Sequence, residues 1–130
     1  MNYRTNSIVL EGVRAQEIKE SLEEDIQEEL GHAELLGQRL KQLDARPPGS
    51  ASFTAKQESL QPPEDSTDVL AVIRGVLDAE EDAITTYRRL VDLARDADDP
   101  VTEDLAVEIL ADEEAHRTEF RGFEKEYSED

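Results

Sequence analysis

The sequence predicts an all-α protein, organised as a bundle of long helices. Apolar residues recur at steps of three and four over long stretches, which is the spacing of amphipathic helices. Four of the five prolines fall in one segment, residues 44–66, so the rest of the chain is free to form uninterrupted helices. A chain of 130 residues has the size of one domain with one core. We therefore expect residues 1–130 to form a single domain.

The first long helix is predicted at about residues 11–43. Its apolar face is formed by Ile18, Leu22, Ile26, Leu30, Ala33, Leu36, Leu40 and Leu43. Residues 44–66 then form an irregular crossover loop. Fully extended, this loop reaches about 75 Å, whereas a helix of 30 residues is about 45 Å long. The loop can therefore cross the bundle lengthwise, and the two helices that it joins are expected to be parallel.

Two further long helices are predicted at about residues 67–96 and 100–127. In the short segment between them, Asp99 is a candidate N-cap and Pro100 suits the first helical position. A connection this short makes the two helices antiparallel neighbours. The apolar positions of the two helices are Val72, Ile73, Val76, Leu77, Ile84, Tyr87, Leu90 and Val91, followed by Leu105, Ile109, Phe120 and Phe123.

The composition excludes several classes of function. The 33 acidic residues outnumber the 14 basic ones, and a net charge of -19 disfavours binding to a nucleic-acid backbone. The acidic excess also suits a protein that works in concentrated salt, so we expect a halophilic source. We see neither a run of apolar residues long enough for a membrane span nor a signal peptide, and expect a cytoplasmic protein without membrane contact. Since cysteine is absent, any metal must be bound by Glu, Asp or His.

Acidic residues occupy positions on the apolar faces where leucine is expected. The only two histidines, His32 and His116, each follow a glutamate by three residues, Glu29 and Glu113, and Glu80 lies on the apolar face of the helix at residues 67–96. Residues i and i+3 share one face of a helix, so each Glu-x-x-His pair can reach one ion. A buried carboxylate is costly unless it is paired, hydrogen-bonded or bound to a cation. Such sets form the di-iron or di-manganese sites of four-helix bundles, although a hydrogen-bonded core histidine is the alternative.

These motifs, taken in order, resemble the ferritin-like di-iron proteins, especially bacterioferritins and the archaeal DNA-protection-like ferritins. The segments that carry the resemblance are "EELGHAELL", the proline-rich crossover, "AEEDAITTYRRL" and "DDPVTEDLAVEILADEEAH", and it extends over nearly all of residues 13–127. It implies a ferritin-like four-helix bundle in which iron is bound by Glu29, His32, Glu80, Glu113 and His116. Glu80 is preferred to Glu81 as the ligand, because only Glu80 lies on the apolar face of its helix. Glu28, Glu81 and Glu114 are expected on the solvated face.

The resemblance also implies that the chain is N-terminally truncated. Glu80 precedes Glu113 by 33 residues, and the same step back from Glu29 falls before residue 1. The family carries a glutamate there on its first helix, and "MNYRTNSIVLEG" resembles the end of that helix. We therefore expect three long helices here, with five of six ligands, and an apolar groove that invites dimerisation.

The function implied by the resemblance is Fe(II) oxidation by oxygen or hydrogen peroxide, a ferroxidase-type oxidoreductase activity that requires a complete site. It would serve iron storage, detoxification and protection from oxidative stress in a homo-oligomer. In this scheme Glu29 and Glu113 bridge the metals, His32 and His116 each cap one, and Glu80 is terminal. Manganese or zinc are further candidates for the site.

Alternative functions remain open at this stage. A rubrerythrin-like peroxidase is weakened by the absence of cysteine, and haem ligation by methionine is unsupported because Met1 is the only one. A metal-free acidic helical bundle that acts as an interaction protein is the alternative from a different class. Tyr87 fits a core position better than a redox tyrosine.

Overall fold

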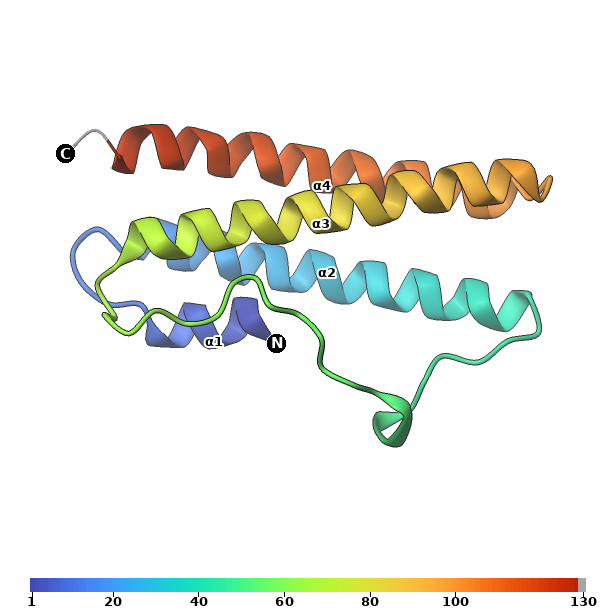
Figure 1. Ribbon diagram of the computed structural model, residues 1–130, viewed down its shortest axis with the longest axis horizontal. Coiled ribbons are helices and arrows are strands. Elements are labelled where there is room, and N and C mark those ends of the chain that lie inside the picture. Colours follow the sequence, from blue (N-terminus) through green and yellow to red (C-terminus); the bar gives the residue numbers. More distant parts are fainter. Residues whose placement is uncertain (129–130) are drawn as a thin grey trace.

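The computed structural model describes residues 1–128, and its regular structure in that range is entirely helical (Figure 1). The elements are α1 (Asn2–Val9), α2 (Gln16–Gln42), the single 3-10 turn η1 (Ser50–Ser52), α3 (Val69–Asp96) and α4 (Pro100–Tyr127). The predicted all-α fold class, with three long helices and a long crossover between the first two of these, is confirmed.

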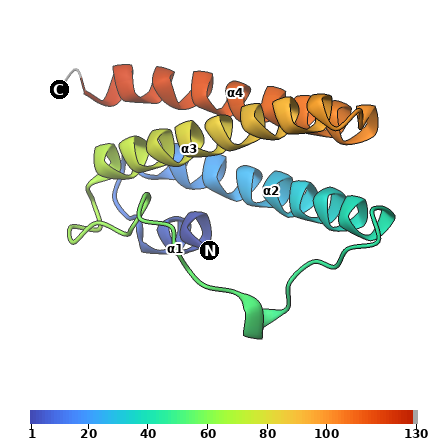
Figure 2. The same cartoon turned by 45° about the vertical axis from the view of Figure 1, so that its right-hand side comes forward.

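The helices form two layers. α1 and α2 run antiparallel and pack together, and α3 and α4 form the second antiparallel pair (Figures 1 and 2). Between Gln42 and Val69 the chain returns along the length of the bundle, so α2 and α3 run parallel. This arrangement brings the middle segments of α2, α3 and α4 together. No helix in residues 1–128 combines the length and the apolar character needed to cross a bilayer.

Caps and turns fix the helix ends. The Asp99 side chain accepts a hydrogen bond from the Thr102 backbone N–H at 3.1 Å, and Pro100 is the first helical residue, as predicted. Arg39 near the end of α2 pairs with Asp99 at 2.8 Å, which ties α2 to the turn between α3 and α4. α2 begins at Gln16 instead of residue 11, because the chain first turns through Gly12, whose φ of 106° lies in the region that favours glycine.

The main core lies at the end of the bundle where α1 packs against α2, and residues of α2, α3, α4 and the connecting segments form it. It contains Leu10, Ile18, Leu22, Leu60, Ile73, Val76 and Phe120, all buried. The prediction that Leu30, Leu40 and Leu43 belong to the apolar face is wrong, because these side chains are exposed. α1 has 8 residues and α2 has 27, so α1 flanks only the first part of α2. Helical spacing identified the apolar face of α2, but the burial of each residue on that face depends on whether another helix packs against it.

Candidate metal centre

Carboxylates and histidines from α2, α3 and α4 meet in the middle of the bundle. Single ligand atoms of Glu29, Glu80, Glu113 and His116 lie within 4.8 Å of one another, and all but Glu29 are buried. They meet because each residue lies on the inward face of its helix, where the spacing of three and four continues from the apolar core. Four predicted ligands therefore share one site.

Glu113 lies between the two histidines. Its Oε1 is 3.3 Å from Nδ1 of His32, and its Oε2 is 3.8 Å from Nδ1 of His116. The same two nitrogens each have a second carboxylate nearby: Glu29 Oε2 is 3.7 Å from Nδ1 of His32, and Glu80 Oε1 is 3.6 Å from Nδ1 of His116. The structure thus brings all five predicted residues together, with Glu113 shared by two histidine-centred halves. Their role as metal ligands remains a prediction.

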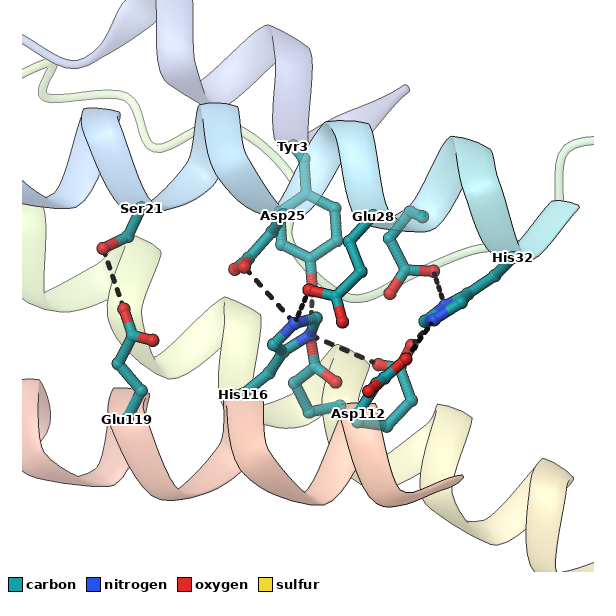
Figure 3. Close-up of polar contacts among 11 residues, drawn as sticks. Tyr3, Ser21, Asp25, Glu28, His32, Asp112, His116 and Glu119 are labelled. Atoms are coloured by element: carbon teal, nitrogen blue, oxygen red, sulfur yellow. Dashed lines mark hydrogen bonds and ion pairs between the residues drawn. The ribbon is translucent and has the colours of Figure 1, made fainter. Parts of the chain in front are cut away.

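The far nitrogens of both histidines contact carboxylates that the sequence analysis did not assign to the site (Figure 3). Nε2 of His116 is 2.6 Å from Glu28 Oε2 and 3.5 Å from Asp25 Oδ1. Nε2 of His32 is 2.8 Å from Asp112 Oδ2. Glu28 was expected on the solvated face, and it is partly exposed, but its carboxylate turns inward to His116.

A signal for these residues was present in the sequence. Glu28 and Asp112 each stand immediately before the glutamate of a Glu-x-x-His segment, so both segments begin with two acids. Asp25 lies one helical turn before Glu29, on the same face. No local pattern marks Tyr3, however, whose hydroxyl donates a hydrogen bond to Glu80 Oε1 at 2.5 Å.

The neighbouring acids Glu81 and Glu114 lie outside the site. Glu81 pairs with Arg117 at 3.0 Å and with Arg121 at 3.4 Å. Glu114 pairs with Arg88 at 3.1 Å. Both carboxylates are exposed, in agreement with the expected solvated face. The phase of the helices therefore separates Glu80 from Glu81 and Glu113 from Glu114.

Burial and crowding shift the protonation equilibria of the centre. Burial, reinforced by Glu80 and Glu29, raises the pKa of Glu113 to about 9. Burial opposes a charge on His116, but the carboxylates around it prevail and raise its pKa to about 12. Burial alone would raise the pKa of Glu80, yet contacts with His116, Glu113 and Tyr3 outweigh it and lower the pKa. Without a metal, protons supply the positive charge that so many acids require.

The chemistry of the donor atoms fits a bound cation. Buried atoms without a hydrogen-bond partner include Glu29 Oε1, Glu80 Oε2, Glu113 Oε1, Asp25 Oδ2 and Nδ1 of both His32 and His116. Buried polar atoms normally find partners, so such a concentration in one place calls for an explanation. A divalent cation would satisfy most of these atoms together. Oxygen and imidazole donors suit iron or manganese, and also accept zinc.

A pocket of about 400 Å³ connects the centre with the crossover segment. Glu29, Glu80 and Glu113 line it, together with Tyr3. Its lining also includes Lys56, Gln57 and Ser59, which belong to the crossover. Small molecules can therefore approach the carboxylates from this side.

Residues 1–127 match the family described as Ferritin-like domain. The chain belongs to this family. Among solved structures it is similar to a dodecameric thioferritin, the bacterioferritin-related protein from Bacteroides fragilis, with a TM-score of 0.86. The two share 24% identity over 98% of this chain and 76% of the other, a level at which the likeness supports the fold. No curated protein matches the sequence. The predicted resemblance to ferritin-like proteins is thus confirmed, and this ferritin-like chain carries carboxylate and histidine groups that could hold a metal.

Proposed function

We propose that this ferritin-like protein binds two Fe(II) ions per chain and oxidises them to Fe(III). The observation that carries the proposal is the place of Glu113, whose two oxygens each face Nδ1 of one histidine, His32 or His116. A carboxylate in that position suits a bridge between two metal ions. The activity would serve iron storage, iron detoxification and protection from oxidative stress in the cytoplasm.

Each predicted ligand then has one role. Glu113 and Glu29 bridge the ions, and His32 and His116 each cap one ion through Nδ1. Glu80 is a terminal ligand in the half of the site that contains His116. The hydroxyl of Tyr3 orients the Glu80 carboxylate through the 2.5 Å hydrogen bond. All these donors are oxygen or nitrogen atoms, which suit Fe(II).

Iron is the substrate of the proposed reaction. Two Fe(II) ions release two electrons, which with two protons reduce oxygen to hydrogen peroxide, or reduce hydrogen peroxide to two water molecules. The buried carboxylates stabilise the higher charge of Fe(III) better than that of Fe(II), because electrostatic attraction is strong in a site that excludes water. The crossover pocket gives the oxidant a route to the centre.

We further propose a homo-oligomer that stores the oxidised iron. The thioferritin with the similar fold is dodecameric, and that assembly is the precedent for this chain. The net charge of -19 attracts cations to the protein surface and raises their local concentration. Sedimentation velocity measures the assembly directly, and a monomer at every concentration would contradict this part of the proposal.

The test is an anaerobic Fe(II) titration followed by a pulse of oxygen, with near-ultraviolet absorbance reporting Fe(III). We expect saturation near two Fe(II) per chain and oxidation far faster than in buffer. Glu113→Ala removes the shared carboxylate and is expected to abolish both. Glu114→Ala is the matched control, because Glu114 is the next residue on α4 but pairs with Arg88 at the surface. Oxidation no faster than in buffer would contradict the ferroxidase activity and favour a metal-free acidic bundle.

A further inference from the structure

Leu60 is the first buried residue of the crossover after α2 ends. Residues 44–58 are all exposed, whereas the Leu60 side chain is 3% exposed and belongs to the main core. Its φ of 60° is a left-handed conformation, which a bulky residue adopts only where its surroundings hold it. The crossover runs close to α1 and α3 in this part of the bundle (Figure 1). The contacts of Leu60 therefore fix the course of the crossover along these helices.

A glycine in α3 allows the crossover to approach closely. A Cβ added at Gly75 would lie 3.1 Å from both Cα and Cδ1 of Leu60. Carbon atoms in favourable contact are about 3.5–4.0 Å apart, so a side chain here would push the crossover away from α3. Glycine inside a helix lowers stability relative to alanine, and its presence in α3 therefore needs a reason. The close approach of Leu60 supplies that reason.

A buried amide on α1 holds the same part of the crossover. Asn6 is fully buried, and its Nδ2 donates to the Leu60 carbonyl at 3.0 Å and to the Asn2 carbonyl at 2.9 Å. Both donor hydrogens of the amide are thus used. The side chain of Asn2 donates to the Ser59 carbonyl at 3.1 Å. Because Asn6 is inaccessible to solvent, water cannot easily replace it as the donor to Leu60.

This attachment lies beside the pocket that leads to the candidate metal centre. The pocket is lined by three carboxylates of the centre and by three crossover residues, Lys56, Gln57 and Ser59. We call residues 56–59 the crossover wall. Gln57 donates to the Ser59 carbonyl at 3.0 Å, and Gln61 donates to the Gln57 carbonyl at 3.0 Å. Since these bonds join the crossover wall to the residues around Leu60, a shift of Leu60 moves the lining of the pocket.

We propose that Asn6 and Gly75 are positioning residues that hold the crossover wall in place and thereby control how fast small molecules reach the metal centre. This inference rests on the proposed function, because the molecules concerned are the metal ion and the oxidant. Neither residue contributes an atom to the centre. Loosening the crossover wall should therefore speed entry and exit by the same factor and leave the equilibrium affinity for metal unchanged.

The experiment compares four variants with the wild-type chain. Asn6→Ala removes the buried donor, and Gly75→Ala introduces the Cβ that displaces the crossover. Thr5→Ala is the control on α1, because the Thr5 hydroxyl donates to the Met1 carbonyl in an exposed position. Gly122→Ala is the control on α4, where an added Cβ meets nothing within 4 Å. Stopped-flow absorbance measures the association and dissociation of Co(II), a redox-stable substitute for Fe(II), and thermal unfolding is recorded for each metal-free protein.

The expected signature is a change in rates without a change in affinity. In Asn6→Ala, both Co(II) rate constants should rise by about 2–10-fold, the factor that corresponds to the loss of one hydrogen bond. Gly75→Ala should raise both as well, because displacing the crossover from α3 widens the entrance. The dissociation constant should stay the same in both variants. The two controls should match the wild type in all these quantities.

A measurement on the metal-free protein tests the crossover wall directly. The chain contains no cysteine, so spin labels can be attached at Glu58→Cys on the crossover and Asp92→Cys on α3, which are both exposed positions. The distance between the two labels then reports how the crossover lies against α3. We expect the distance distribution to shift or broaden when Asn6→Ala or Gly75→Ala is added, and to stay unchanged with either control.

Two results would overturn the inference. One is a label distance that stays the same in both Asn6→Ala and Gly75→Ala. The other is an unchanged association rate constant for Co(II) in both variants, whatever happens to the thermal midpoint, which would make the two residues structural only. If the wild-type chain itself binds neither Co(II) nor Fe(II), the proposed function fails, and the label distances alone decide whether Asn6 and Gly75 fix the crossover wall.

Discussion

His116 and His32 hold equivalent positions in two Glu-x-x-His segments, yet they differ in what surrounds them. Four carboxylates lie within 4.0 Å of His116, from Asp25, Glu28, Glu80 and Glu113. Three lie near His32, from Glu29, Asp112 and Glu113. The carboxylates that contact His116 but not His32 include Glu80 from α3 and the buried Asp25. One local motif therefore gives two different electrostatic environments, because the neighbouring helices contribute unequally.

The most direct way to break this asymmetry is to remove each histidine in turn. In the metal-free protein, His116→Ala removes the cation that lies among four acidic side chains, and we expect a loss of about 3–5 kcal/mol in the free energy of unfolding. His32→Ala should cost about 1–3 kcal/mol, because fewer buried acids lose a partner. Urea unfolding of both variants measures the difference. Equal losses would mean that the two halves are electrostatically alike.

The pH dependence of stability tests the shared carboxylate. The pKa of Glu113 is raised to about 9 from an ordinary value of 4.5, so the folded protein retains a proton that the unfolded chain releases. This contribution to stability is complete below the ordinary value and is lost as the pH rises through about 9. We expect the thermal midpoint of the metal-free protein to fall over this range. Glu113→Gln should flatten the slope, and an unchanged slope in this variant would contradict the assignment.

A smaller change sharpens the comparison within the half that contains His116. Tyr3→Phe removes only the hydroxyl that donates to Glu80, and should cost about 1–2 kcal/mol in the free energy of unfolding. Tyr127→Phe is the control, since that hydroxyl donates to the Arg14 carbonyl at 2.7 Å in an exposed position. Chemical unfolding compares the two. A similar loss of unfolding free energy in both variants would mean that the hydrogen bond to Glu80 stabilises the protein no more than the exposed one.

The smallest effect is expected from the acid next to Glu80. Glu81→Ala removes exposed ion pairs with Arg117 and Arg121, which should change stability by about 0–1 kcal/mol. Its Fe(II) binding should equal that of the wild type, whereas Glu80→Ala should lose the ion capped by His116. A loss of iron binding in Glu81→Ala would show that the phase assigned to α3 is wrong.

Much of the fold was predictable because helices are governed by local rules. The spacing of apolar residues predicted the long helices, and the prolines of residues 44–66 predicted the crossover. Asp99 and Pro100 predicted the start of α4 to the residue. The sequence could not show that Leu30 is 61% exposed, because burial of a residue depends on whether another helix covers it.

The sequence by itself determined that the five predicted site residues lie on the inward faces of their helices. The step of three residues in each Glu-x-x-His segment places both side chains on one helix face, and the phase of α3 selects Glu80 over Glu81. Only the tertiary structure decided which partners those residues meet. The pairing of Glu28 with His116, and the hydrogen bond from Tyr3 to Glu80, depend on the axial offset and spacing between helices. Packing of whole helices sets these quantities, and a periodicity within one helix carries no information about them.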